Sequence, residues 1–298
     1  MPEARAPIDQ RLARRRFERA ARSYAKASRI ETEIGARMLQ RLEYVRVAPQ
    51  RILDAGAGPS REARALAARY RGASVIALDY SFAMLREARR GAGLFGALSR
   101  HARPSAVCAE LEQIPLAAGS VGLVWSNMAL HWLDEPLGAL REFHRVLAPG
   151  GLLMFSMLGP DSLKELRCAA GRERVHDFPD MHDVGDRLIG AGFAAPVMDM
   201  EMLRLRYAAP EDLLEDLRRS GQTSARRGAR RGLAGRGDRT RLLEALRASR
   251  TQGEFYATYE IVYGHAWKEE AAVRPSGAAR PAPLRFIPPR GAPPASNP

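Results

Sequence analysis

Short apolar runs alternate with helical patterns along most of the chain, and this alternation constrains the fold more than any other feature. Strands separated by helices of ordinary length form βαβ crossovers, which produce a parallel sheet covered on both faces. We therefore expect an α/β fold with a doubly wound, mostly parallel, seven-stranded sheet. The expected strands are 51–55, 74–78, 105–108, 121–126, 152–157, 196–207 and 255–267, the expected helices are 61–70, 82–90, 136–147 and 184–191, and a turn is expected at 149–151.

The chain is expected to divide into five segments around this sheet. Apolar residues recur at helical spacing over 11–46 and predict an N-terminal cap. Glycine and arginine dominate 224–241, which leaves two interpretations for the insertion around it, a helical lid over the site or a solvated loop. The predicted segments are a helical cap (1–48), an α/β core (49–207), an Arg-rich helical insertion or lid (208–253), the last strand (254–268) and a disordered Pro/Ala-rich tail (269–298).

Composition restricts the environment and the partners. The net charge is +13, yet lysine occurs only at Lys26, Lys164 and Lys268, so 44 of the 47 basic residues are arginine. A GC-rich coding sequence explains this bias, so we expect no nucleic-acid partner, while an acidic protein partner fits the charge equally well. The 2 cysteines exclude a disulfide framework and a Cys-rich zinc site. We expect a cytoplasmic protein without a metal, a membrane span or a secretory signal.

The strongest local motif is the strand–turn–helix sequence I-L-D-A-G-A-G-P-S at 52–60. Gly56 and Gly58 allow a tight turn and a close approach of a ligand to the main chain. Asp54, at the end of the strand, is suited to a positively charged group. The rival interpretation is the dinucleotide fingerprint G-x-G-x-x-G, but Arg61 stands where its third glycine is required.

A carboxylate at the end of the second strand supports a nucleoside ligand. Asp79 follows the glycine turn by about 20 residues, where a carboxylate accepts both ribose hydroxyls. The alternative is a capping or surface aspartate.

These residues together resemble the class I S-adenosylmethionine (SAM)-dependent methyltransferases. Glu110 follows the third strand where the family usually has aspartate for adenine, and R-V-L-A-P-G-G at 145–151 matches the turn before strand five. Gly122 stands where aspartate is common, and Ser60 replaces a third glycine. The resemblance implies a Rossmann-like fold with SAM as cofactor. The residues that it assigns to the cofactor are Asp54, Gly56, Gly58, Asp79, Tyr80, Glu110, Leu111 and Asn127.

Further segments resemble the malonyl-acyl-carrier-protein O-methyltransferases of biotin synthesis. Phe17 to Tyr24 is similar to their F-x-x-A-x-x-x-Y helix, and W-S-N-M-A-L-H-W at 125–132 to their W-S-N-x-A-x-Q-W segment, with His131 in place of glutamine. This resemblance extends to about residue 268. It implies methyl transfer from SAM to the free carboxylate of malonyl-acyl-carrier protein, an acidic partner.

A carboxylate acceptor needs no general base, because its pKa lies near 4. The candidate substrate residues are Tyr24, His131, Trp132 and Arg167. His131 follows strand four and is suited to donating a hydrogen bond, and Arg167 to gripping a carboxylate through two parallel bonds. The alternatives are a structural histidine beside Trp132 and a surface arginine.

Two other functions stay open at this stage. The mitochondrial complex I assembly factors, which modify an arginine of a respiratory subunit, share the same segments. An RNA or small-molecule methyltransferase is disfavoured, because S-N-M-A at 126–129 replaces the N/D-P-P-Y motif of base-amine methylation. If the partner is an acyl-carrier protein, we expect arginines of the insertion to steer its association, namely Arg226, Arg227, Arg230 and Arg231.

Overall fold

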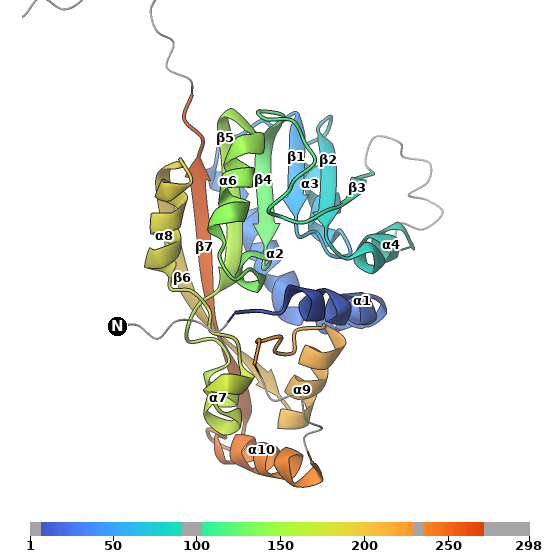
Figure 1. Ribbon diagram of the computed structural model, residues 1–298, viewed down its shortest axis with the longest axis vertical. Coiled ribbons are helices and arrows are strands. Elements are labelled where there is room, and N and C mark those ends of the chain that lie inside the picture. Colours follow the sequence, from blue (N-terminus) through green and yellow to red (C-terminus); the bar gives the residue numbers. More distant parts are fainter. Residues whose placement is uncertain (1–6, 91–102, 229–234, 271–298) are drawn as a thin grey trace, which may run out of the picture.

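A seven-stranded sheet forms the centre of the protein, as seen in the computed structural model, which describes residues 7–90, 103–228 and 235–270 (Figure 1). Its strand order is β3-β2-β1-β4-β5-β7-β6, and β7 is antiparallel to both neighbours. The predicted doubly wound, mostly parallel fold is confirmed. The strands are β1 (Arg51–Ala55), β2 (Ser74–Asp79), β3 (Ser105–Cys108), β4 (Val121–Asn127), β5 (Leu147–Leu158), β6 (Ala194–Tyr207) and β7 (Phe255–Trp267).

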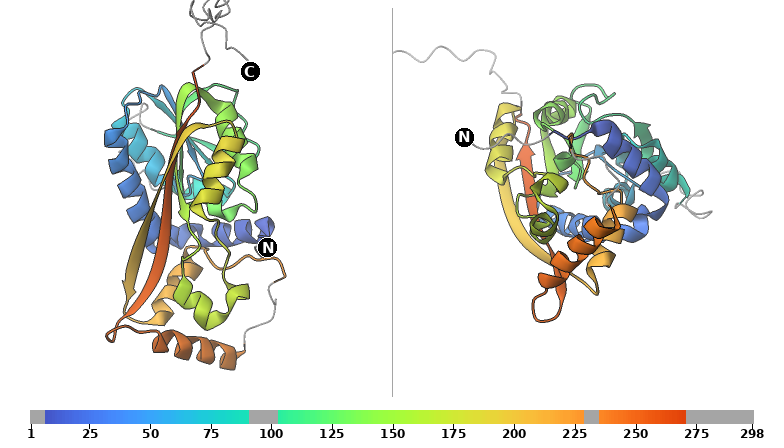
Figure 2. Two further views of the ribbon diagram at one scale, coloured as in Figure 1. Left: turned by 90° about the vertical axis from the view of Figure 1, so that its left-hand side faces the viewer. Right: turned by 60° about the horizontal axis from the view of Figure 1, so that its bottom comes forward.

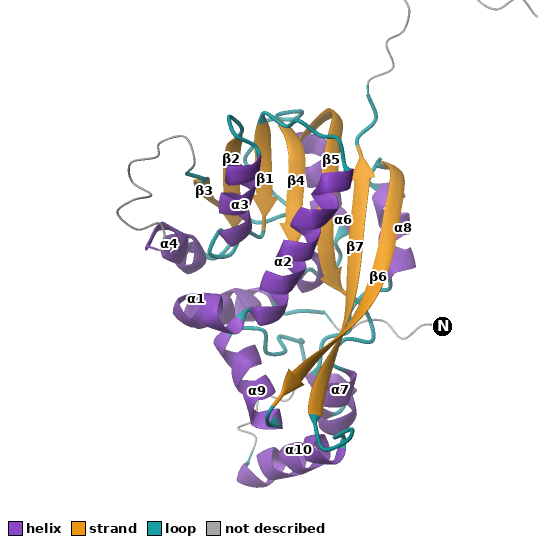
Figure 3. Ribbon diagram, turned by 180° about the vertical axis from the view of Figure 1, so that it is seen from behind, coloured by secondary structure: helices purple, strands orange, loops and turns teal. Residues whose placement is uncertain are grey.

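Helices cover both faces of the sheet, because the central strands are apolar on both sides. Neighbouring residues Val124 and Trp125 of β4 are both buried, one in each of the two core clusters. α2 and α3 pack on one face, and α6 and α8 on the other (Figures 1 and 3). The helices are α1 (Gln10–Ala27), α2 (Arg29–Arg41), α3 (Arg61–Arg69), α4 (Phe82–Arg90), α6 (Leu137–Val146), α7 (Lys164–Ala170), α8 (Met181–Gly190), α9 (Pro210–Arg219) and α10 (Arg236–Ala248), with 3-10 turns at Leu42–Tyr44, Leu130–Trp132 and Arg172–Arg174.

The N-terminal helical segment is divided into two helices that point in different directions. Ser28 leaves helical geometry at φ −77° and ψ 58°, while its N–H still donates to the Tyr24 carbonyl. After this break α2 lies against the sheet, whereas α1 crosses below the carboxyl ends of the parallel strands (Figure 1). The apolar periodicity over 11–46 marks the helices but contains no sign of this change of direction.

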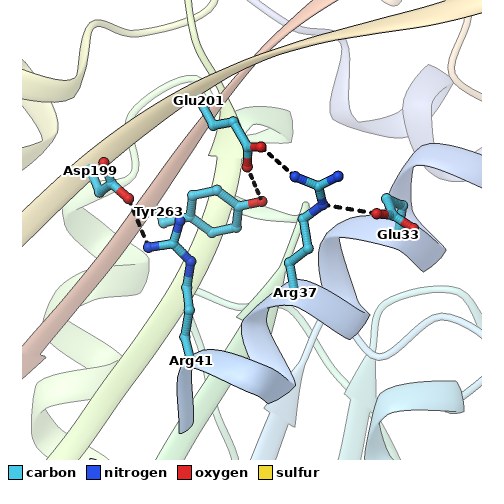
Figure 4. A network of polar contacts seen from close by, with 6 residues as sticks. All are labelled: Glu33, Arg37, Arg41, Asp199, Glu201 and Tyr263. Carbon is cyan, nitrogen blue, oxygen red and sulfur yellow. Dashed lines mark hydrogen bonds and ion pairs between the residues drawn. The ribbon is translucent and has the colours of Figure 1, made fainter. Parts of the chain in front are cut away.

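Polar contacts fasten α2 to the last two strands (Figure 4). Arg41 donates to Asp199 at 2.7 Å, and its guanidinium lies 4.0 Å from the ring centre of Tyr263. Arg37 bridges Glu33 of its own helix and Glu201 of β6. Because exposed ion pairs stabilise folded proteins little, their main effect is to fix the orientation of α2.

β6 and β7 extend beyond the rest of the sheet. β5 pairs with β7 only from Leu158↔Ile261 to Leu152↔Trp267, whereas β6 continues to Tyr207↔Phe255. The two-stranded extension carries an accessory lobe made of α7, α9 and α10, which Figure 2 shows around its far end. Phe255, Ala257 and Tyr259 are buried there. The insertion before the last strand therefore contributes two helices to this lobe, and α7 was not predicted.

The predicted turn at 149–151 is instead an irregular start of β5. β5 begins at Leu147, directly after α6, and its pairing with β4 shifts register between Val121 and Leu123. Gly150 has φ +73°, and its N–H donates to the Lys268 carbonyl. Pairing with neighbouring strands of the sheet therefore incorporates into β5 a sequence that would form a turn in isolation. The predicted tail, apart from Glu269 and Glu270, lies outside the described residues.

Gly264 in β7 offers a test of the packing of the sheet. Its partner across the strands is Phe155, and a Cβ at Gly264 would lie 2.3 Å from the Phe155 ring. We expect Gly264→Ala to lower the free energy of unfolding by about 1–3 kcal/mol, because overpacking displaces a buried ring. Gly190→Ala is the control, since no atom lies within 4 Å of its added Cβ. Equal unfolding midpoints in urea for the two variants would contradict this packing.

Candidate functional site

A cavity lies where the parallel strands end, and we call it the cofactor cavity. It encloses about 720 Å³ of empty space, including its mouth. The residues after four successive strands of the sheet line it, together with α1, which crosses its opening. Its lining includes Phe17, Tyr24, Glu31, Gly56, Gly58, Asp79, Tyr80, Met84, Glu110, Leu111, Asn127, Met128, Ala129, Trp132 and Gln222. Seven of the eight residues predicted for the cofactor are thus brought together here, and Asp54 lies in an adjoining cavity.

Asp79 organises the centre of this cavity. Its Oδ2 accepts the Gly58 N–H at 2.8 Å, and its Oδ1 accepts the Ser81 N–H at 2.7 Å. Burial raises the pKa of Asp79 to about 6, although these two hydrogen bonds oppose the rise. One carboxylate therefore joins the ends of β1 and β2, and it retains oxygen lone pairs for further donors.

The two glycines of the turn have different roles. Gly56 has φ +81°, and a Cβ there would lie 2.4 Å from the Cβ of Ala129. Gly58 has φ +50°, and its nearest neighbour would be the Tyr24 ring at 3.8 Å. Gly56 is therefore required by the packing of the protein itself, whereas Gly58 leaves space on the side of the cavity.

The adjoining cavity is strongly acidic, and we call it the acidic pocket. It shares Tyr24, Glu31, Gly56, Gly58 and Asn127 with the cofactor cavity and adds Asp54, Glu62 and Arg61. Burial raises the pKa of Asp54 well above its usual range, and the nearby Glu62 raises it further. Asp54 Oδ2 is buried without a hydrogen-bond partner in the protein. Since a buried unpaired polar atom is costly, the pocket favours a cationic ligand that donates hydrogen bonds.

Glu31 lies at the junction of these two cavities, and its side chain is 7 % exposed. Its Oε1 accepts a hydrogen bond from Gln222 Nε2, while its Oε2 is buried without a partner. Asn127 Nδ2 donates to its main-chain oxygen at 2.9 Å. Burial raises the pKa of Glu31 to about 7.

The sequence motifs did not predict four of these site residues, namely Glu31, Gln222, Glu62 and Arg61. Gln222 meets Glu31 across 191 positions of sequence, and no local motif contains the pair. In the sequence, Arg61 stands out only as a departure from a dinucleotide motif. Glu31, Arg61 and Glu62 lie among other charged residues of α2 and α3, and Gln222 lies in a loop, so the local sequence does not distinguish them from surface residues.

The opposite end of the cofactor cavity contains Tyr80, Glu110 and Leu111. Glu110 is half exposed, and Arg14 approaches its carboxylate at 3.6 Å. Burial raises the pKa of Tyr80, and its Oη has no partner in the protein. This end is therefore less acidic and more open, and it presents an acceptor carboxylate beside apolar surface.

A second cavity adjoins the first and shares Trp132 and Gln222 with it; we call it the acceptor cavity. It encloses about 790 Å³ of empty space and is mainly apolar, with walls from the three helices of the accessory lobe and from Phe178. His131 is 2 % exposed, and its Nδ1 accepts the Leu158 N–H at 3.4 Å, which assigns the ring proton to Nε2. His176 and the exposed Arg174 also line this cavity.

The structure separates the four predicted substrate residues. Tyr24 lines the cofactor cavity, Trp132 lies between both cavities, and His131 lines the acceptor cavity. Arg167 lines neither of these cavities, because its Nη2 turns back to the Ser162 carbonyl at 3.2 Å. Arg174 is the arginine that the structure places at the acceptor cavity.

The predicted docking arginines are also divided. Arg226 forms an ion pair with Asp177 at 2.7 Å and donates to the carbonyls of Arg172 and Val175. It therefore anchors the insertion within the protein. Arg227 lines a shallow surface depression with Gln10, and Arg230 and Arg231 lie outside the described residues.

The two departures from the methyltransferase motifs leave the site intact. Ser60 adopts the left-handed region at φ 56° and precedes α3 directly. Gly122 lies at the opposite, amino end of the sheet, where a Cβ would approach Pro49 at 3.1 Å.

Within residues 7–90, 103–228 and 235–270, no group of three or more His, Cys, Asp and Glu residues could hold a metal ion. The same ranges contain no helix with the length and apolar character needed to span a membrane.

The shifted pKa of Glu31 predicts a stability effect. In the protein without ligand, folding raises this pKa from 4.5 to about 7, so ionisation of Glu31 opposes folding; the cost is absent below pH 4.5 and complete above about pH 7. We expect Glu31→Gln to raise the free energy of unfolding by on the order of 3 kcal/mol near pH 8 and to leave it nearly unchanged near pH 4.5. Urea unfolding at both pH values measures the difference.

Glu33→Gln on the same helix is the control, because Glu33 is exposed and should give no such pH-dependent gain. A gain for Glu31→Gln that is equal at both pH values would contradict the burial of an ionised carboxylate.

Comparison with known proteins places this architecture in a family. Residues 53–155 match the family model described as "Methyltransferase domain". Two solved structures share the fold, the BH2331 protein of Bacillus halodurans (TM-score 0.58, 18 % identity, 79 % of this chain and 98 % of that chain covered) and the YcgJ protein of Bacillus subtilis (TM-score 0.57, 16 % identity, 78 % and 98 % covered). At these identities the likeness concerns the fold alone.

Sequence relatives extend over nearly the whole chain. A malonyl-[acyl-carrier protein] O-methyltransferase of Methylovorus sp. is 45 % identical, with 94 % of this chain and 96 % of the relative covered. That of Laribacter hongkongensis is 47 % identical, with 89 % and 92 % covered. The chain is therefore a SAM-dependent methyltransferase by its domain, and it belongs to the malonyl-[acyl-carrier protein] O-methyltransferase family.

Proposed function

We propose that the protein transfers a methyl group from SAM to the free carboxylate of a malonyl thioester on acyl-carrier protein, the methyl ester formation of biotin precursor synthesis. The observation that carries this proposal is the pair of adjoining cavities. The cofactor cavity, with the acidic pocket beside it, suits a cationic nucleoside, and the acceptor cavity is apolar. Trp132 and Gln222 form the wall between them.

The cofactor cavity fits SAM by the chemistry of its donor and acceptor groups. Asp79 retains lone pairs for ribose hydroxyls, and Glu110 with Leu111 provides an acceptor and an apolar surface for adenine. The unpartnered Oδ2 of Asp54 suits the ammonium of the methionine part. Arg61 lines the acidic pocket and suits its carboxylate. We assign Gly56, Gly58, Tyr80 and Asn127 to the wall against which the cofactor packs.

SAM supplies an electrophilic methyl group for in-line displacement. The acceptor carboxylate is ionised near neutral pH, so no residue has to remove a proton from it. The protein contributes alignment and the exclusion of water. Phe17 packs edge-on against Trp132, with ring centres 4.9 Å apart, and Tyr24 lies over the glycine turn, so that α1 closes the cavity above the reacting groups.

The acceptor cavity suits the thioester and its pantetheine arm. Its leucines and Phe178 provide apolar walls, and Arg174 provides a cation for an anionic group of the carrier or its arm. We assign His131, which lines this cavity, to hold the oxygen of the acceptor carboxylate that does not attack, or the thioester carbonyl. In this arrangement His131 positions the acceptor and does not act as a base.

The relatives give no support to the alternative role in complex I assembly. The names of the relatives state the acceptor of those proteins as malonyl-[acyl-carrier protein], and the cavity pair provides for a small anionic acyl group on a long arm.

The direct experiment incubates the protein with methyl-labelled SAM and either malonyl- or acetyl-acyl-carrier protein. We expect an alkali-labile methyl ester on the malonyl carrier and none on the acetyl carrier, because only malonyl has a free carboxylate. Mass spectrometry of the carrier measures both. Failure to label the malonyl carrier, with SAM bound, would reject the proposed acceptor.

Substitution of His131 tests its positioning role. We expect His131→Leu to lower kcat/KM for the malonyl carrier by about 10- to 100-fold, because a hydrogen bond to a charged acceptor is lost. His131→Gln, which restores a donor, should retain most of the activity. Steady-state kinetics and SAM affinity are measured for both variants. Wild-type kinetics for His131→Leu would show that this histidine is structural.

A further inference from the structure

Glu31 carries an unused acceptor at the junction of the cofactor cavity and the acidic pocket. The side chain is more than nine-tenths buried, and its Oε2 has no hydrogen-bond partner in the protein. A buried acceptor without a donor costs free energy, more so when the group is charged. A ligand that brings a donor to Oε2 would remove this penalty, and the free energy so recovered would favour its binding.

The surroundings of Glu31 hold its carboxylate in place. Gln222 donates to Oε1, and Asn127 fixes the main-chain oxygen of the same residue at 2.9 Å. Ser156 donates in turn to Asn127 Oδ1 at 2.8 Å, which fixes the orientation of the amide. The position of Oε2 is thus determined before any ligand binds.

The chemistry of SAM offers two cationic groups, and only one meets the requirement of Oε2. The sulfonium has no N–H or O–H and supplies charge alone, whereas the ammonium of the methionine part has three N–H donors. Asp54 Oδ2, in the adjoining acidic pocket, also lacks a donor. Both residues line the acidic pocket, and an ammonium has enough N–H groups to donate to both oxygens.

Building on the proposed function, we propose that Glu31 is a cofactor-binding residue whose Oε2 accepts a hydrogen bond from the ammonium of SAM, with Gln222 holding the carboxylate in place. The cofactor is then bound between α2 and the glycine turn. Gln222 also lines the acceptor cavity, so that the residue that orients Glu31 belongs to the wall that the two cavities share.

Binding measurements without the carrier test this inference. Three ligands separate the cations: SAM has both, S-adenosylhomocysteine has the ammonium alone, and 5′-methylthioadenosine has neither. We expect Glu31→Met, which removes both oxygens, to weaken SAM and S-adenosylhomocysteine by the same factor, about tenfold or more, and to leave methylthioadenosine unchanged. Glu31→Gln, which keeps an oxygen but loses the charge, should give a smaller loss of the same pattern. Calorimetry measures all affinities.

Glu33→Gln is the matched control, because Glu33 lies on the exposed side of α2 and pairs with Arg37. It should bind all three ligands as the wild type does. A loss confined to SAM would assign Glu31 to the sulfonium and overturn the inference. An equal loss for all three ligands would show a structural role, and no loss would show no role. Wild-type protein that bound none of the three would instead reject the proposed cofactor.

Discussion

The buried carboxylate of Asp79 is the interaction on which the site depends. It accepts main-chain N–H groups from Gly58 and Ser81, and it thereby fixes the glycine turn after β1 relative to the end of β2. Burial opposes its ionisation and raises its pKa to about 6. Burial also opposes the ionisation of Asp54 and Glu31. All three carboxylates lie at the edge of the sheet where the parallel strands end. Ligands bind at that edge in open α/β sheets.

The same clustering of charge explains why this cavity suits SAM better than a neutral nucleoside. The buried acids Asp54 and Glu31 and the partly buried Glu62 lie around one pocket, with Arg61 as the accompanying cation. A ligand with a positive charge and hydrogen-bond donors relieves both the repulsion and the unpaired oxygens. The apolar acceptor cavity shares Trp132 and Gln222 with the cofactor cavity, so that in the proposed arrangement the two substrates would meet at a wall formed by few residues.

Local sequence patterns predicted the site residues that lie at or just after the end of a strand. Gly56 and Gly58 follow β1, and Asp79 and Asn127 are the last residues of β2 and β4. Parallel pairing brings such positions together whatever lies between them. Glu31 and Gln222 could not be found in this way, because their contact spans 191 residues and joins α2 to the segment after α9. Arg167 was predicted to bind the acceptor carboxylate, but its guanidinium donates to the Ser162 carbonyl just before its own helix. The irregular start of β5 likewise depends on pairing with β4 and not on its own P-G-G residues.

A crystal structure with S-adenosylhomocysteine would test the central claim most directly, that the carboxyl edge of the sheet binds the cofactor through buried acids. The account predicts ribose hydroxyls on Asp79, adenine beside Glu110 and Leu111, and the ammonium shared by Asp54 Oδ2 and Glu31 Oε2. A ligand bound in the reverse direction, or with its ammonium in solvent and both oxygens still unpaired, would contradict it.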